Sequence, residues 1–329
     1  MIRYPHPVSA AFFMIAAGAL YAVVNSVTAL VTGSPEWGCQ TAQGQLCFGF
    51  DGRSYTFLQY GIALLCTLPF LMGKGSLDAL KTSQFPLHLL RVAAAVVGVE
   101  LWVAGFARGL PLWTMVALLM TSPLFVIAGS ALILRERVGP HRWLATITGF
   151  VGVAIVLEPW RDFNSDLLFP LVASFAWAAS SLCVKPLARV DSTETITLWL
   201  LVLFTPLALL ATWVYPDFTA NSYSWWGIGQ GVVWPDSLSV TLLLLIVGFL
   251  TAMAQLCLAL SYKLGDASYV QPFDHVKLLF NIAFSWWLFN DVPRGILWLG
   301  VALILGAGIY LGLRELRIHR LSPHAGVLK

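Results

Sequence analysis

The sequence predicts an all-α integral membrane protein with ten transmembrane helices arranged as two inverted five-helix repeats. Its composition predicts that the protein lies in a membrane. Of the 329 residues, 58% are hydrophobic and only 11% are charged, whereas soluble domains carry about 25% charged residues. Apolar runs without a charge recur along the whole chain. Lipid is therefore the expected solvent, and the distribution of Lys and Arg then gives the number of crossings.

Ten segments are long and apolar enough to be predicted as spans. Crossing about 30 Å of hydrocarbon takes about 20 residues at 1.5 Å per residue. The first segment has 25 residues without a charge, which exceeds a signal-peptide core and predicts an uncleaved span. The fifth is the shortest between charges, with 15 residues from Arg142 to Glu158. The predicted spans are 8–32, 54–73, 85–107, 111–134, 140–158, 166–186, 195–215, 238–262, 267–290 and 294–313.

The positive charges predict the orientation of these spans. An even number of crossings places both termini on one side, and Lys and Arg concentrate on the cytoplasmic side of membrane proteins. With cytoplasmic termini, thirteen Lys and Arg residues lie inside and four lie outside, namely Arg53, Arg108, Arg161 and Arg294. We therefore expect a multi-pass protein of the bacterial inner membrane with cytoplasmic N- and C-termini. The net charge of +3 then reflects topology, and no nucleic-acid partner is expected.

The chain is weakly similar to itself at an offset of 155 residues. The offset contains five spans, an odd number, so the second half must be inverted relative to the first. We expect a first repeat over residues 1–160, holding spans one to five, and a second over 161–329, holding spans six to ten and a short cytoplasmic tail. The pairs that carry this similarity include Glu136 with Asp291, Trp143 with Trp298, Phe125 with Phe280 and Glu100 with Gln255.

Two cysteines fall in the first long outer loop. Cys39 and Cys47 have seven residues between them, and an oxidising compartment would permit a disulfide between them. Two free thiols are the alternative. The remaining cysteines lie in separate spans, where small packing residues are common.

Several stretches resemble the EamA-like proteins of the drug/metabolite transporter superfamily. Residues 134–143 and 149–153 resemble the signature that ends the first half, and 261–268, 271–278 and 289–293 resemble that of the second half. The resemblance implies ten helices in two inverted repeats, with a central cavity lined mainly by the first, third, fourth, sixth, eighth and ninth helices. It implies transport of a small organic metabolite without identifying the solute. The chain departs from the family pattern at Asp291, where Glu is more usual, and at His275, where Tyr is common.

Ionisable residues inside the predicted spans are the main candidates for a solute site. A charge at the centre of a spanning helix costs about 2.5 to 3.5 kcal/mol on insertion scales, so such residues normally face a cavity or a partner. Glu100 lies in the third span, and its repeat mate Gln255 lies in the eighth. If both face inward, they form a polar pair across the axis that relates the halves.

The ninth span carries a polar stripe at helical spacing. Gln271, Asp274, Asn281 and Ser285 share one face, with His275 and Lys277 on its flanks. One interpretation is that the stripe lines a solute pathway. The other is a structural ion pair, because Asp274 and Lys277 are three residues apart and close enough to neutralise each other. The further candidates for contact with a solute are Asn25, Tyr21, Trp102, Trp177 and Tyr262.

These features predict a secondary transporter that works by alternating access on a small organic metabolite. Acidic, basic and aromatic groups together suit a zwitterionic or amphipathic solute. The sequence has no phosphate-binding loop, His-Glu-x-x-His motif or Gly-x-Ser-x-Gly motif. We therefore expect no direct use of ATP, no cofactor, no metal and no enzymatic activity. The alternatives are a membrane enzyme that uses the buried carboxylates, and a membrane sensor or assembly subunit without transport activity.

Overall fold

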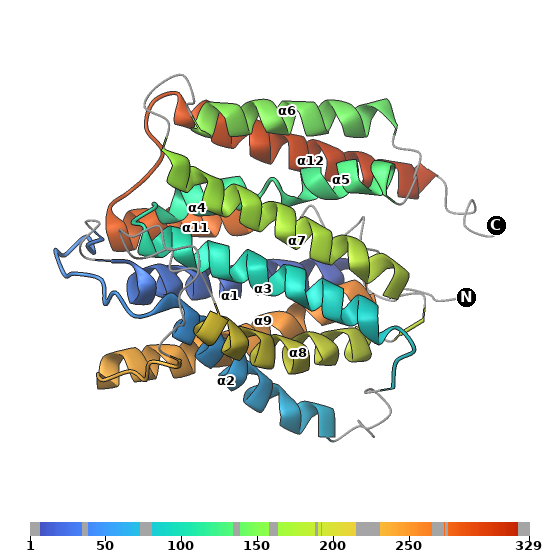
Figure 1. The fold of residues 1–329 in the computed structure, drawn as a ribbon. Coiled ribbons are helices and arrows are strands. Elements are labelled where there is room, and N and C mark those ends of the chain that lie inside the picture. The colour runs from blue at the N-terminus through green and yellow to red at the C-terminus, as the bar shows by residue number, and fades with distance from the viewer. Residues whose placement is uncertain are drawn as a thin grey trace.

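The computed structural model describes residues 7–34, 39–72, 81–133, 139–157, 164–187, 190–191, 193–214, 231–264, 273 and 276–321. Long helices run lengthwise beside one another through the molecule (Figure 1). Helix α1 begins and α12 ends at the same end of this bundle (Figure 1). The helices are α1 (Pro7–Thr32), α2 (Gly52–Met72), α3 (Phe85–Ala107), α4 (Leu112–Leu119), α5 (Ser122–Leu132), α6 (Pro140–Leu157), α7 (Leu168–Leu187), α8 (Thr193–Val214), α9 (Leu238–Leu264), α11 (Val276–Phe289) and α12 (Leu297–Leu321).

Each predicted span contains helical residues among those that the structure describes, and five helical segments are long and apolar enough to cross a membrane by themselves. Those five are Ser9–Thr32, Phe85–Ala107, Ser165–Val184, Thr195–Trp213 and Leu238–Leu258. Shorter apolar helices cover Trp143–Val156, Val276–Phe289 and Leu297–Ala307. An α-helix satisfies its backbone hydrogen bonds internally, so apolar helices of this length are stable in lipid. Because the chain has several of them, the molecule is a multi-pass helical membrane protein.

The fourth predicted span, 111–134, is two helices and not the single helix expected from its apolar pattern. Helix α4 ends at Leu119 and α5 begins at Ser122. Pro123 lies in the first turn of α5, and a proline has no N–H to continue the hydrogen-bond ladder of the preceding helix. The Thr121 hydroxyl donates to the carbonyl of Leu118 at 2.6 Å, which satisfies one backbone acceptor at the break.

Three helix pairs make the most extensive contacts in the bundle. These are α1 with α9, α3 with α7, and α6 with α12. The pair α6 and α12 lies side by side along the upper edge of Figure 1. An added Cβ on Gly152 would lie 2.8 Å from the carbonyl oxygen of Gly300, and one on Gly300 would lie 2.9 Å from that of Gly152. Small residues thus allow the two backbones to approach closely, which is a common basis for helix association in lipid.

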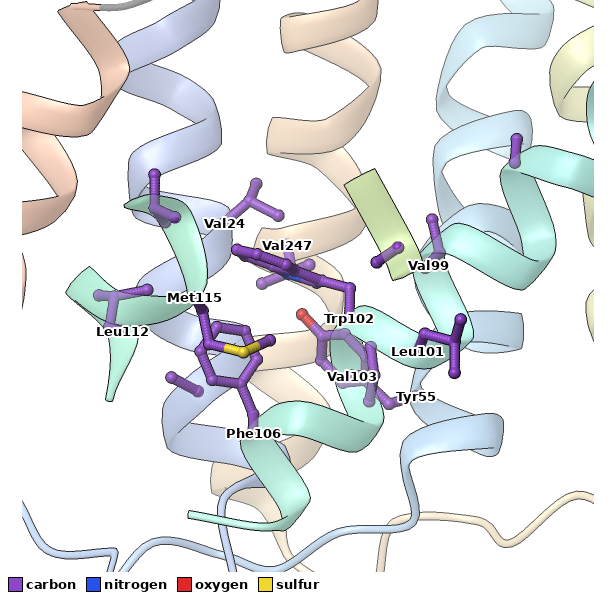
Figure 2. Close-up of a cluster of buried hydrophobic side chains, with 14 of the residues drawn as sticks. Val24, Tyr55, Val99, Leu101, Trp102, Val103, Phe106, Leu112, Met115 and Val247 are labelled. Atoms are coloured by element: carbon purple, nitrogen blue, oxygen red, sulfur yellow. The ribbon is translucent and has the colours of Figure 1, made fainter. Parts of the chain in front are cut away.

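The largest buried apolar cluster is centred on α3 and draws side chains from several other helices. Trp102 and Phe106 of α3 lie beside Met115 of α4, Val24 of α1 and Val247 of α9 (Figure 2). Tyr55 of α2 enters the same cluster, and its hydroxyl shares a 2.7 Å hydrogen bond with Thr28 of α1. The cluster therefore packs α3 against helices of both halves of the chain.

A disulfide joins Cys39 and Cys47 in the connection between α1 and α2. The loop is also held by backbone hydrogen bonds: the N–H of Phe48 donates to Leu30 at 3.0 Å, and the N–H of Ala42 donates to Leu288 at the end of α11. The disulfide loop is thereby fixed to α1 in the first half and to α11 in the second.

We expect Cys39→Ser to destabilise the purified protein. In the chain-entropy model, closing a loop of this length contributes about 2 to 3 kcal/mol, so the apparent melting temperature in detergent should fall by several degrees. Cys66→Ser, which removes a free thiol, is the matched control. Equal melting temperatures for the two variants and the unmodified protein would show that the disulfide contributes no stability.

Candidate functional site

A polar contact between α1 and α11 brings several of the predicted site residues together. Asn25 Nδ2 donates to Asn281 Oδ1 at 3.3 Å, and Asn281 Nδ2 donates to the carbonyl of Lys277 at 2.7 Å. Gly18 allows this approach, since a Cβ there would lie 3.3 Å from the Cβ of Lys277. Tyr21 lies one turn before Asn25 on the same face of α1. These residues therefore form one polar group between the two halves.

Ser285 extends this group by one turn of α11 beyond Asn281. Both side chains are fully buried. Within the described part of the chain, Ser285 Oγ has no hydrogen-bond partner. A buried hydroxyl without a partner loses its hydration without compensation, so this atom is a candidate to bind a ligand or a water molecule.

An aromatic group lies on the neighbouring faces of α3 and α7. The rings of Trp102 and Trp177 meet edge to face with centroids 6.5 Å apart. Trp177 lies over Gly98, where an added Cβ would be 3.5 Å from its ring. Trp102 also lies beside Val24, the residue before Asn25 (Figure 2). The aromatic pair and the polar group thus adjoin the same stretch of α1.

The break between α4 and α5 adds two polar residues that the sequence analysis did not select. Thr121 and Ser174 of α7 share a hydrogen bond of 2.7 Å, and both side chains are buried. Ser174 is three residues before Trp177 and so lies on the same face of α7. The signal that could have identified Thr121 is its place just before Ser122-Pro123 within an apolar run.

Glu100 lies on a different side of α3. Its side chain is 4% exposed, the Thr56 hydroxyl of α2 is its hydrogen-bond partner, and Tyr60 of α2 is a close neighbour. Tyr60 in turn stacks on Phe204 of α8, with ring centroids 3.7 Å apart. Glu100 Oε1 has no hydrogen-bond partner among the described residues. The carboxyl therefore faces α2.

The predicted pair of Glu100 with Gln255 is not formed by a hydrogen bond in the described structure. Gln255 is half-buried on α9, and the Glu100 carboxyl has its partner on α2. Residues 271, 274 and 275 lie outside the described residues, as does the side chain of Tyr262. The role of Gln271, Asp274, His275 and Tyr262, and the choice between an Asp274–Lys277 ion pair and a solute contact, thus stay predictions.

The opposite end of α3 is fixed to the second half by buried polar contacts. His88 Nε2 lies 2.8 Å from a carboxylate oxygen of Asp191, in the connection between α7 and α8. The same oxygen accepts from the Thr82 hydroxyl at 2.7 Å. Arg91 donates to the carbonyl of Ile196 of α8 at 2.8 Å and is 9% exposed. These contacts explain the ionisable residues near this end of α3 without a solute.

The fold and the buried polar groups between its halves define a polytopic helical membrane protein of the transporter class. The model of the EamA-like transporter family matches residues 24–158 and again 164–313. The chain therefore belongs to the EamA-like transporter family, as its signatures indicated, and it is a membrane transporter of small molecules.

Several curated relatives are similar over most of their length. A protein of Vibrio cholerae named riboflavin transporter is 44% identical over 91% of this chain and 91% of its own length. One of Rhizobium johnstonii with the same name is 41% identical over 94% of this chain and 93% of its own. A protein of Rickettsia prowazekii named S-adenosylmethionine uptake transporter is 23% identical over 78% and 81%.

A crystal structure with 17% sequence identity has the same fold. It matches with a TM-score of 0.59 and covers 95% of this chain and 98% of the other chain.

Asp291, in the turn between α11 and α12, should make stability depend on pH. Partial burial raises the pKa of this carboxyl above its ordinary 3.8, and the Trp113 side chain and Arg294 oppose the shift. Because the folded state binds the proton more tightly than the unfolded state, stability falls as pH rises from about 4 through the raised pKa.

We expect the melting temperature of the wild type to fall between acidic and neutral pH. Asp291→Asn should remove the part of this fall that Asp291 causes. Asp236→Asn, at an exposed carboxylate, is the control. A wild-type slope in Asp291→Asn would contradict the assignment.

Proposed function

We propose that this chain is a secondary carrier of riboflavin, or of a closely related flavin, in the bacterial inner membrane. The observation that carries the proposal is the similarity to three proteins named riboflavin transporter, which are 44%, 41% and 37% identical and cover 91%, 94% and 91% of this chain. The relatives named for S-adenosylmethionine uptake are only 22% to 23% identical.

The carrier works by alternating access between two inverted five-helix repeats, 1–160 and 161–329, with ten crossings in total. Two separate matches to the family model, over 24–158 and 164–313, support this division. The helix packing supports it as well. Exchanging the repeats converts the α1–α9 contact into the α7–α3 contact, while the α6–α12 and α2–α8 contacts are each converted into themselves. Such a pseudo-twofold relation is typical of carriers that rock around a central site.

The termini face the cytoplasm in this proposal. The bias of Lys and Arg supports it, and so does the disulfide of Cys39 and Cys47, since disulfides persist in oxidising compartments such as the bacterial periplasm. The disulfide loop then lies on the periplasmic side.

The solute site lies between α1, α3, α7 and α11. Riboflavin is uncharged and amphipathic: it has a flat aromatic ring system, a ring edge with alternating donors and acceptors, and a chain of hydroxyl groups. Trp102 and Trp177 offer aromatic surface for the ring. The side-chain amides of Asn25 and Asn281 each offer a donor and an acceptor for the ring edge.

Further polar groups suit the hydroxyl chain. Ser285 Oγ is buried and unpartnered within the described residues, and Thr121 and Ser174 form a hydroxyl pair at the helix break. Discontinuous helices commonly form the solute sites of carriers, because the break leaves backbone groups available. The remaining candidates from the sequence are Tyr21, Tyr262, Gln271, Asp274, His275 and Lys277, while Glu100 and Gln255 lie outside this group.

A zwitterionic solute of the S-adenosylmethionine type is the second candidate. Lys277 of α11, whose backbone carbonyl accepts from Asn281, favours it, because a lysine ammonium group is a common partner for a carboxylate. Riboflavin is uncharged and S-adenosylmethionine is charged, so one site should not bind both compounds well. Competition between the two compounds for uptake therefore distinguishes the two candidates.

Purified protein in liposomes should accelerate the flux of labelled riboflavin, and excess S-adenosylmethionine should not compete. Trp102→Ala should reduce the apparent affinity about 5-fold to 150-fold, since stacking of an aromatic base on a side chain contributes about 1 to 3 kcal/mol. Trp286→Ala, on α11 and 62% exposed, should bind riboflavin normally. Melting temperatures of both variants would show that they fold.

Two outcomes would contradict the proposal. The absence of riboflavin flux in active liposomes would exclude riboflavin as the solute. Equal loss of affinity in Trp102→Ala and Trp286→Ala would exclude the site between α1, α3, α7 and α11.

A further inference from the structure

Glu100 is a buried carboxyl group that the proposed flavin site does not use. It is 4% exposed within a helix of the bundle, and Oε1 has no hydrogen-bond partner among the described residues. A charged carboxylate at such a place costs about 2.5 kcal/mol or more on insertion scales. A neutral, protonated carboxyl avoids that cost.

Among the described residues, the charged groups around Glu100 do not supply a cation of its own. The charged groups that act on its carboxyl are Asp51, just before α2, and Arg53 at the start of α2, and Arg53 already pairs with Asp51 at 3.5 Å. The titratable and charged residues on α3 and on the helices packed against it are Tyr21 of α1, Arg53, Tyr55, Tyr60 and Cys66 of α2, His88 and Arg91 of α3, Cys183 and Lys185 of α7 and Glu194 of α8, with Asp51 before α2 and none on α4.

The other charged residues lie near the far end of these helices. His88, bound to Asp191, marks that end, and it is twelve residues from Glu100, or about 18 Å along a helix axis. Asp51 and Arg53 are each 21% exposed, so water reaches the start of α2. Glu100 therefore lies on the side of the bundle where the partly exposed Asp51–Arg53 pair meets water.

Glu100 and Trp102 project from nearly opposite sides of α3. Two residues along an α-helix correspond to a rotation of about 200°. Glu100 accordingly contacts Thr56 and Tyr60 of α2, while Trp102 contacts Trp177 of α7. A proton on Glu100 and a solute against Trp102 would not compete for space, so both can be bound at the same time.

We propose that Glu100 binds the proton that is cotransported with the solute. The proposal rests on riboflavin being a solute of this carrier. One proton enters from the periplasmic water past Asp51 and forms an O–H bond with the Glu100 carboxylate, while neutral riboflavin binds on the opposite side of α3. After the carrier reorients, that O–H bond breaks, and the proton and riboflavin both leave to the cytoplasm. No covalent bond of the solute changes.

The test uses purified full-length protein in liposomes that hold a pH-sensitive dye. With one proton per riboflavin, an inward gradient of one pH unit should drive about a tenfold accumulation of riboflavin. In the reverse experiment, an inward gradient of riboflavin should acidify the lumen of wild-type liposomes. This second measurement needs no variant.

Glu100→Gln imitates the protonated carboxyl and should abolish both accumulation and lumen acidification, while exchange of labelled for unlabelled riboflavin continues. Asp166→Asn, at a carboxylate 3.5 Å from Arg108 outside the core, should retain both couplings. Exchange without any response to the pH gradient in wild type, or accumulation that persists in Glu100→Gln, would overturn the role of Glu100 and leave riboflavin transport intact. No riboflavin flux of any kind in wild type would overturn the proposed function and this inference together.

Discussion

The hydrocarbon interior of a membrane offers no hydrogen-bond partner, and this constraint governs the structure of the chain. Backbone groups there must be satisfied within each helix, and polar side chains must find partners inside the protein. The hydroxyls of Ser26, Thr28 and Thr32 therefore donate to carbonyls of their own helix. Where α4 ends early, Thr121 serves the exposed backbone in the same way.

The same constraint gives meaning to the polar groups that are incompletely satisfied. Ser285 Oγ and Glu100 Oε1 are both buried, and neither has a partner among the described residues. They lie on different helices. Ser285 Oγ on α11 continues the Asn25–Asn281 group, whereas Glu100 Oε1 on α3 faces α2. A flavin that binds at Ser285 Oγ and a proton that binds at Glu100 would give each of these atoms a separate function.

Much of the fold could be predicted from the sequence because its physical cause is simple. Charge-free runs predict helices in lipid, and the helix limits agree closely, as for 85–107 and Phe85–Ala107. The break at Thr121 was not predicted, because an apolar pattern reports burial in lipid and not continuity of the backbone. Pro123 was the local signal, and proline inside an apolar helix more often bends it than divides it.

The candidate site was predicted less completely, since the sequence gives which residues share a helix face but not which helix lies opposite. Asn25 and Asn281 were both selected, yet they are 256 residues apart and only the packing of α1 on α11 brings them together. Glu100 was selected as an ionisable residue inside a predicted span, but its hydrogen-bond partner Thr56 on α2 was not anticipated. Helical spacing alone could not separate the α2 side of α3 from its α7 side.

The central claim is that flavin is bound inside the membrane, between the two halves of the chain. A cryo-electron microscopy structure of the protein with riboflavin tests it most directly. The account predicts density for the ring system against Trp102, with its polar edge toward Asn25 and Asn281. Ordered flavin on the lipid-facing surface, or within the disulfide loop and away from these residues, would contradict it.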